Sequence, residues 1–259
     1  MTQLEFALSE MLDHTIYLSK RAFKHIQIGT REPQKLCIAP LSIRALHKAH
    51  AINILVKEGL FEEAQTILRI LIEISFVIRA IKNDESFAFQ YGRSAFVQKE
   101  TYLKNLLKGH RELGEAILTH EKTEQIESLL AKISTYVKRI KAKKITVRDY
   151  ADASGLLAVY YTVYSDLSST VHSGPEDVER FFSSDEEFQM LRIGPPKEGR
   201  KDVLFWIAIE AMIRILQDSS AVFGCSIIGL EKAVRNYERV SAHLMTEVQN
   251  AAQQGAAAP

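Results

Sequence analysis

The segment YSDLSSTVHSGP, residues 164–175, combines several hydroxyl groups with a histidine just before a Gly-Pro pair. In a helix, Ser165, Ser168 and His172 share one face, because they follow one another at steps of three and four. A histidine in the last turn lies at the negative end of the helix dipole, which favours the imidazolium and brings its titration toward neutral pH. His172 is therefore a candidate general acid or base, and the alternative is a cation that ends a helix.

A second group of polar residues lies in the apolar segment FEEAQTILRILIEISFVIRAIK, residues 61–82. This segment is apolar on most of its circumference, which predicts a central helix. Arg69 and Glu73 are an i,i+4 pair on one face of that helix. They form either a surface ion pair on a narrow solvated stripe, or a partly buried pair that holds or orients a polar group, since burying such charges costs stability.

A third group is the basic stretch YVKRIKAKKITVR, residues 136–148, which contains no acidic residue. Lys138, Arg139 and Lys141 could contact phosphate groups there. The alternative is a cluster of cations at a helix C-terminus, where the helix dipole favours positive charge. Tyr136 is the only aromatic residue of the stretch, so the stretch shows little sign of a base-stacking surface.

Apolar residues recur at helical spacing along most of the chain, which predicts an all-α multi-helix bundle. We expect helices over residues 2–27, 41–58, 60–82, 84–107, 121–143, 156–173, 201–223 and 229–250. Pro33 and Pro40 are expected to frame a loop, and residues 180–193 to form a small β-hairpin around the polar turn SSDEE. A single helical domain is expected over residues 1–250, with a low-complexity disordered tail over 251–259.

The charge and residue composition of the chain restrict its possible contacts with nucleic acid, membranes and metal ions. Lys and Arg number 33 against 32 Asp and Glu, so attraction to nucleic acid must come from a local patch. The acidic amino terminus and the charge-broken apolar runs predict a cytoplasmic protein without membrane contact. No histidine follows a Glu-x-x-His pattern, and His47 and His50 have no acidic or thiol partner nearby in sequence. We therefore expect no metal and no cofactor.

Two segments, AHAINILVKEGLFEEAQTILRILIE (49–73) and VYYTVYSDLSSTVHSGP (159–175), resemble a bacterial all-helical family. In that family a helix of the form A-x2-L-x-R-x-L-x-E is followed later by a Tyr-Arg-x2-Ser-x3-His segment. Arg69 and Glu73 match the first pattern here, and Tyr164, Ser168 and His172 match the second.

The second segment also resembles the active motif of the HEPN superfamily, which comprises metal-independent helical ribonucleases of toxin–antitoxin and phage-defence systems. In that superfamily an arginine precedes the histidine by four to six intervening residues, near a dimer interface. The corresponding positions here hold Ser165, Asp166 and Leu167. Without that arginine, charge developing on a phosphate has no positioned partner from this helix.

The sequence is therefore consistent with two candidate functions of the protein. The first is a HEPN-like helical binding protein of a bacterial defence, toxin–antitoxin or stress context, with a reduced or absent catalytic motif. The alternative is a metal-independent endoribonuclease in which His172 is the general acid or base, and Arg69 and Glu73 bind and orient the phosphate. The expected partners are a second copy of the chain, and RNA or a partner protein. The expected binding residues are Tyr164, Ser165, Ser168, Lys138, Arg139 and Lys141.

Overall fold

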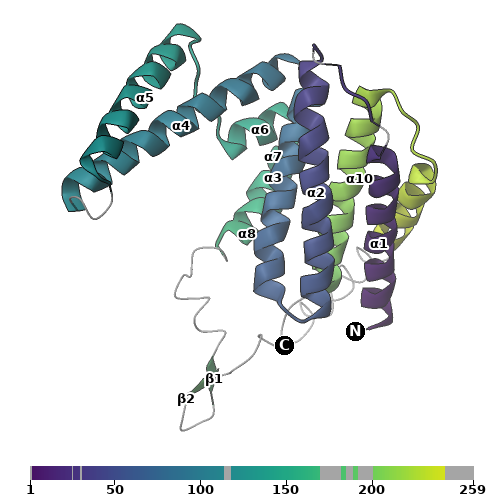
Figure 1. The fold of residues 1–259 in the computed structure, drawn as a ribbon. Helices are drawn as coiled ribbons and strands as arrows, with labels where there is room; N and C mark the ends of the chain where they lie inside the picture. Colours follow the sequence, from purple (N-terminus) through teal and green to yellow (C-terminus); the bar gives the residue numbers. More distant parts are fainter. Residues whose placement is uncertain are drawn as a thin grey trace.

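Four long helices pack side by side as the main bundle of the protein (Figure 1). They are α1 (Gln3–Phe23), α2 (Pro33–Lys57), α3 (Phe61–Asn83) and α10 (Lys201–Phe223). The computed structural model describes residues 2–24, 26–29, 31–113, 118–169, 182–184, 189–191 and 201–242. A further helix over residues 230–242 packs beside α1 and α10, where Leu18, Leu216 and Leu230 form a small apolar cluster. The all-α prediction is confirmed.

Helix α3 is the centre of the bundle. Residues Ile74 to Ile78 are all buried, although five successive helical residues point in directions that cover the whole circumference. Neighbours on several sides produce this burial, since α3 packs against α2 and α10 and also against α6 (Val147–Ala153). The central position predicted for residues 61–82 is thus confirmed, and polar groups on α3 lie close to the core.

Helix α2 starts earlier than expected, and the loop predicted between Pro33 and Pro40 is wrong. Pro33 occupies the first turn of α2, where a missing N–H group costs nothing, because helix-starting N–H groups have no intrahelical partner. Pro40 lies inside the helix and removes one backbone hydrogen bond. The neighbouring Ile38 and Leu41 are buried in the core, and this burial offsets the lost bond.

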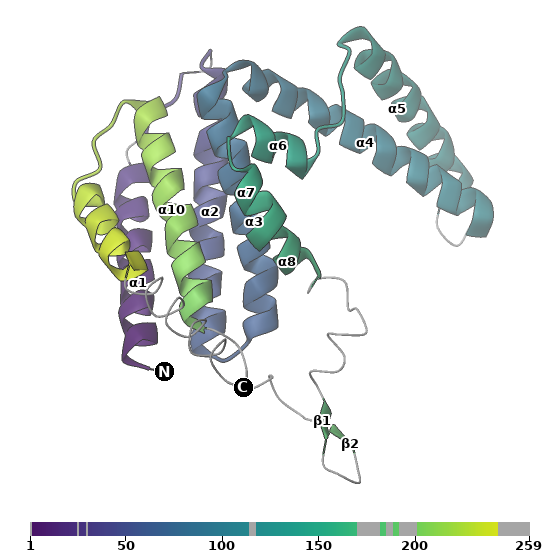
Figure 2. The same cartoon turned by 180° about the vertical axis from the view of Figure 1, so that it is seen from behind.

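Helices α4 (Ser86–Leu113) and α5 (His120–Arg139) form an antiparallel arm that projects from the bundle. Both views show the two helices side by side and away from the four long helices (Figure 2). The arm therefore exposes most of its surface, and only Ala88, Ser94, Leu103 and Leu107 of α4 and Ile133 of α5 are buried.

The helix expected over residues 156–173 is interrupted by a π-helical segment. Helix α7 (Leu157–Val159) leads into the π-helix η2 (Tyr160–Tyr164), which continues as α8 (Ser165–Ser169). This composite helix packs on α3, with Phe76 and Tyr164 in ring contact. A π turn adds one residue to the helical repeat, so faces that were assigned from a 3.6-residue period change across it.

A two-stranded antiparallel sheet lies in the region where a small hairpin is expected. Strand β1 (Phe182–Ser184) pairs with β2 (Gln189–Leu191), and Ser183 lies opposite Met190. The tail predicted over residues 251–259 lies outside the described residues. Within the described part of the chain, no helix has the length and apolar character needed to cross a lipid bilayer.

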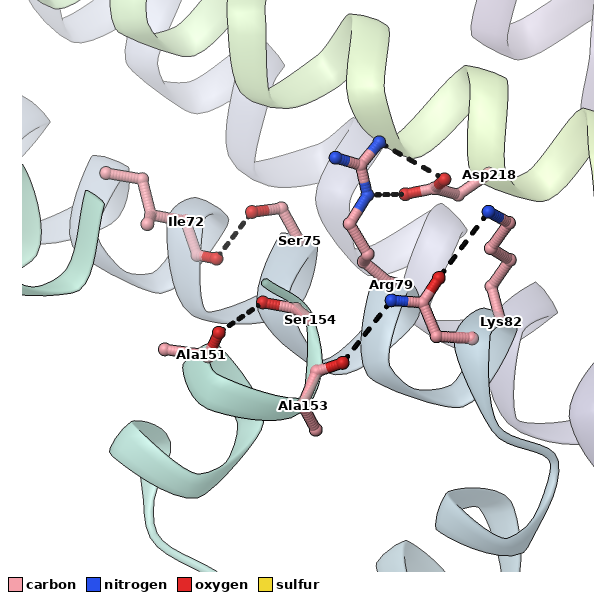
Figure 3. Close-up of polar contacts among 9 residues, drawn as sticks. Ile72, Ser75, Arg79, Lys82, Ala151, Ala153, Ser154 and Asp218 are labelled. Carbon is pink, nitrogen blue, oxygen red and sulfur yellow. Dashed lines mark hydrogen bonds and ion pairs between the residues drawn. The ribbon is translucent and has the colours of Figure 1, made fainter. Parts of the chain in front are cut away.

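A buried ion pair connects α3 to α10 (Figure 3). Arg79 Nε donates to Asp218 Oδ2 at 2.9 Å, and Arg79 Nη2 donates to Asp218 Oδ1 at 3.3 Å. Asp218 is 4% exposed, so its charge depends on this two-point contact with the guanidinium. At the same end of α3, Asn83 Nδ2 donates to the carbonyl of Ala153 at 3.3 Å, which ties α6 to the bundle.

Candidate functional site

Arg69 on α3 lies against the π-helical segment. Its guanidinium carbon is 4.8 Å from the centroid of the Tyr164 ring, which is a cation–π distance. Tyr164 is 5% exposed, and the Tyr160 ring stacks on it with centroids 5.3 Å apart and an angle of 18° between the planes. Two predicted site residues, Arg69 and Tyr164, are therefore brought into contact by the packing of two different helices.

The guanidinium of Arg69 is incompletely satisfied. Its Nε atom is buried and has no hydrogen-bond partner within the described part of the protein. A buried donor without an acceptor costs about 1–3 kcal/mol, so proteins rarely retain one without a reason. The atom can donate a hydrogen bond to an oxygen atom of a bound molecule.

Three tyrosines from three different elements lie close enough to Glu73 for its charge to act on them. They are Tyr91 of α4, Tyr150 of α6 and Tyr164 of η2, and burial is the largest cause of the raised pKa of each phenol. The negative charge of Glu73 raises all three pKa values further, and that of Tyr150 reaches about 12. At neutral pH these phenols keep their protons and can donate hydrogen bonds.

The ion pair expected between Arg69 and Glu73 does not form within the described residues. Arg69 covers the ring of Tyr164, whereas Glu73 interacts with the tyrosines. Glu73 raises the pKa of the Tyr164 phenol, and Arg69 opposes that effect, so Tyr164 lies in the fields of both charges. The ion pair of both interpretations is therefore replaced by contacts with aromatic side chains, and the binding of a polar group by these two partly buried residues stays a prediction.

The hydroxyl groups of the composite helix have different environments. Ser165 is exposed, and its Oγ donates to the carbonyl oxygen of Tyr160, five residues earlier, at 2.8 Å. This bond satisfies a carbonyl of the π turn, so the hydroxyl of Ser165 already has a structural role. Ser168 is half-buried one turn later. π turns occur often at functional sites, and this one places Tyr164 beside Arg69.

His172 lies outside the described residues. The joint role of His172, Arg69 and Glu73 in the endoribonuclease alternative therefore stays a prediction. The structure describes Tyr164 and Ser168 of the second motif, and of these two residues Tyr164 contacts Arg69.

The predicted basic residues lie on the arm and not with Arg69 and Glu73. Lys138 and Arg139 end α5, and Lys141 follows in the loop after it. The guanidinium carbon of Arg139 is 5.0 Å from the centroid of the Tyr136 ring. Tyr136 is the only aromatic residue of the basic stretch, but Phe96 of α4 packs on it with ring centroids 4.8 Å apart.

The spacing of residues in the sequence does not predict the tyrosines that interact with Glu73 or the aromatic neighbour of Tyr136. Tyr91 and Phe96 come from the arm helix α4, and Tyr150 comes from α6, which follows the arm in the chain. Each looks like an ordinary aromatic residue of an amphipathic helix. A sequence signal exists only for Tyr150, which follows a capping box formed by Thr146 and Asp149 and is thus placed in the first turns of a helix.

We call the group of Arg69, Glu73, Tyr91, Tyr150 and Tyr164 the α3 site. The fold and the α3 site define an all-helical bundle protein with a polar and aromatic site between its central helix and a π-helical segment. The chain belongs to the family described as "Family of unknown function (DUF5677)", which matches residues 36–190, more than half of its 259 residues. Searches of curated proteins and of solved structures returned no match. The matched range includes Arg69, Glu73, Tyr164 and His172, so both motif segments belong to the family region.

Proposed function

We propose that this protein is a HEPN-like helical binding protein of a bacterial defence, toxin–antitoxin or stress context, in which the catalytic motif is reduced. The observation that carries the proposal is the buried Nε of Arg69, which lies beside Tyr164 and has no acceptor among the described residues. With Glu73 and its three tyrosines nearby, the site offers a positive donor, neutral donors and one carboxylate acceptor. Such a set suits a polar ligand that carries an anionic oxygen.

The reduced motif favours binding over catalysis. Ser165 stands at a position where the resembling superfamily has arginine, and its hydroxyl is bonded to the Tyr160 carbonyl. A ribonuclease must stabilise the charge that develops on the phosphate, and a hydroxyl used in this way supplies no positive charge. The alternative, a metal-independent endoribonuclease with His172 as general acid or base, is the competing outcome of the test.

The test incubates the purified protein with total bacterial RNA in EDTA, beside His172→Ala and Arg69→Gln variants. We expect no cleavage by any of the three. RNA cleavage by the parent protein that disappears in His172→Ala would contradict the proposal and identify a metal-independent nuclease.

The binding function is tested directly by thermal shift with nucleoside monophosphates, nucleoside diphosphates and inorganic phosphate. We expect at least one of these anions to raise the thermal midpoint of the parent protein and to have no effect on Arg69→Gln, which removes the guanidinium and its positive charge. Arg111→Gln is the matched control, because Arg111 is an exposed arginine in the last turn of α4. Equal shifts for all three proteins would contradict a site at Arg69.

We also propose that the protein is a homo-oligomer that acts in the cytoplasm with RNA or a partner protein. The oligomer is supported by an exposed stripe on α2 that contains Leu36, Ile43 and Ile54.

A further inference from the structure

The arm carries a second surface that the α3 site does not explain. Phe96 of α4, Tyr136 of α5 and Arg139 form a contact group that we call the aromatic cluster. The two rings are tilted by 57° with 4.8 Å between their centroids, and the guanidinium carbon of Arg139 is 5.0 Å from the Tyr136 centroid. Phe96 is 39% exposed, and Arg139 is also exposed. A flat ring can therefore stack against this group from the solvent side.

Two surface hollows lie beside the aromatic cluster. One, of about 440 Å³, is lined by Ala131, Lys132, Thr135, Tyr136 and Arg139. The other, of about 300 Å³, is lined by Gln90, Arg93, Lys141, Ala142, Lys143 and Ile145. Arg93 and Phe96 are three residues apart on one face of α4, so the second hollow adjoins the aromatic cluster.

The cations of this surface are not neutralised by the described carboxylates. Arg93, Lys132, Arg139, Lys141 and Lys143 form no ion pair within the ranges that the structure describes. Elsewhere on the arm, Lys104 pairs with Glu100 at 2.6 Å and Lys108 with Glu112 at 3.7 Å. The positive charge is therefore local, on a chain whose formal net charge is only +1.

Lys141 is held in an uncommon backbone conformation at the end of α5. Its φ of 50° is positive, which no other non-glycine residue in the described part of the chain shows. The N–H of Ala142 bonds to the Val137 carbonyl at 3.1 Å, and the N–H of Lys141 bonds to the Lys138 carbonyl at 3.2 Å. These two bonds form a Schellman motif, and the position of Lys141 in that motif is usually glycine. A lysine is less favourable than glycine in this conformation, and residues held in such conformations cluster at functional sites.

We propose that the aromatic cluster of Phe96, Tyr136 and Arg139, together with the cations beside it, binds single-stranded nucleic acid. The lysines and arginines contact phosphates, and bases stack on the aromatic and guanidinium planes. Unstacked bases are available only in single strands, which is why this class of ligand fits better than a duplex. The inference does not depend on the proposed α3 site, since the two surfaces share no residue.

The test measures fluorescence anisotropy of labelled 15-nucleotide single strands of mixed sequence, as RNA and as DNA, with the full-length protein. A duplex of the same sequence and a 15-residue polyglutamate serve as competitors. We expect the single strands to bind, the duplex to compete at least tenfold less well, and polyglutamate to compete weakly. Comparison of the RNA with the DNA strand identifies which source supplies the ligand.

Variants assign the binding to this surface. Tyr136→Leu should weaken binding about fivefold to 150-fold, the usual effect of losing one stacking partner. Lys141→Gly should weaken binding and lower the slope of log affinity against log salt by about 0.7, while the thermal midpoint stays equal or rises. Lys122→Ala is the matched control, because Lys122 is an exposed lysine of α5 that lines neither hollow.

Four outcomes would overturn the inference. One is the absence of binding to either single strand by the parent protein. Another is an equal loss of affinity in Lys141→Gly and Lys122→Ala. The third is polyglutamate competition as strong as that of RNA together with full binding by Tyr136→Leu, which would indicate a site for acidic protein. Binding that is lost in Arg69→Gln but kept in the arm variants would place the nucleic acid at the α3 site, and would leave the proposed function standing.

Discussion

Two arginines of α3 differ in the way their charge is satisfied, and this difference separates a binding role from a structural one. Arg79 makes a two-point contact with the buried carboxylate of Asp218. Arg69 lies over an aromatic ring, and its Nε has no acceptor among the described residues. The first arrangement stabilises the fold, whereas the second leaves a donor for a ligand.

We therefore predict opposite consequences for stability when each arginine is replaced. Arg79→Met should lower the free energy of unfolding by about 3 kcal/mol, because it leaves Asp218 buried without a partner. Arg69→Met should change it by less than about 1 kcal/mol, since a lost cation–π contact is offset by removal of the unsatisfied donor. Urea unfolding followed by circular dichroism measures both values. Equal losses in the two variants would mean that Arg69 is also a structural residue.

The tyrosines around Glu73 predict a pH dependence of stability. Burial raises the pKa of Tyr150 to about 12 in the folded protein, whereas an unfolded tyrosine titrates near its ordinary value of 10.0. The folded state thus holds this proton more tightly, and the corresponding stability is complete below pH 10 and is lost as the pH rises through about 12. The loss from this one phenol should approach about 2–3 kcal/mol.

The prediction is measured as the difference in unfolding free energy between the parent protein and Tyr150→Phe at pH 8 and at pH 11. The parent should lose more stability than the variant over this range, because phenylalanine has no proton to release. Tyr102→Phe, which changes a 63% exposed tyrosine, is the control and should behave like the parent. Parallel pH profiles for all three proteins would refute a buried phenol at Tyr150.

At the scale of elements, short capped helices determine the geometry of the α3 site. Helix α6 has only seven residues, and it brings Tyr150 to Glu73. Its first turn is closed by the Thr146 and Asp149 side chains, with 2.7 Å from the Thr146 nitrogen to Asp149 Oδ2 and 3.2 Å from the Asp149 nitrogen to Thr146 Oγ1. So short a helix is marginal on its own and relies on its cap and on packing against α3.

Loss of this cap should destabilise the protein. Thr146→Ala removes one side of the capping box and should cost about 1 kcal/mol of unfolding free energy. Thr119→Ala is a matched control, because Thr119 precedes α5 in the same backbone region but its side chain makes no capping hydrogen bond. If the midpoint of thermal or urea unfolding falls equally for Thr119→Ala and Thr146→Ala, the capping box makes no contribution of its own to the free energy of unfolding.

At the scale of the whole molecule, the bundle leaves apolar groups exposed on the outer face of α2. Leu36, Ile43 and Ile54 are 46%, 38% and 49% exposed, and His47 and His50 lie between them on the same face. An apolar stripe of this kind is typical of a surface that is covered in an assembly. A second copy of the chain is the occupant that we expect, as the sequence already predicts self-association.

The expected result is a mass above that of the 29.3 kDa monomer in light scattering at micromolar concentration. Ile43→Asp together with Ile54→Asp should return the mass to that of a monomer, because buried charge opposes association. Tyr102→Asp on the arm is the control and should keep the oligomer. A monomeric mass for the parent protein would refute self-association.

The sequence by itself determined the helical class and the central place of residues 61–82, and it selected Arg69 and Tyr164, which the fold brings into contact. These features follow from a local period of apolar residues and from residue types, which are visible along one stretch of chain. The same local reasoning failed at Pro40, where core burial outweighs a lost hydrogen bond, and at residues 160–164, where a π turn changes the helical period.

Only the tertiary structure decided which side chains meet. Glu73 acquires Tyr91, Tyr150 and Tyr164 from three elements, and Arg69 contacts the Tyr164 ring instead of pairing with Glu73. Phe96 likewise reaches Tyr136 only because α4 and α5 run antiparallel along the arm. Periodicity states which face of a helix is apolar, but the partner of that face depends on how helices pack, and packing is set by the free energy of the whole core.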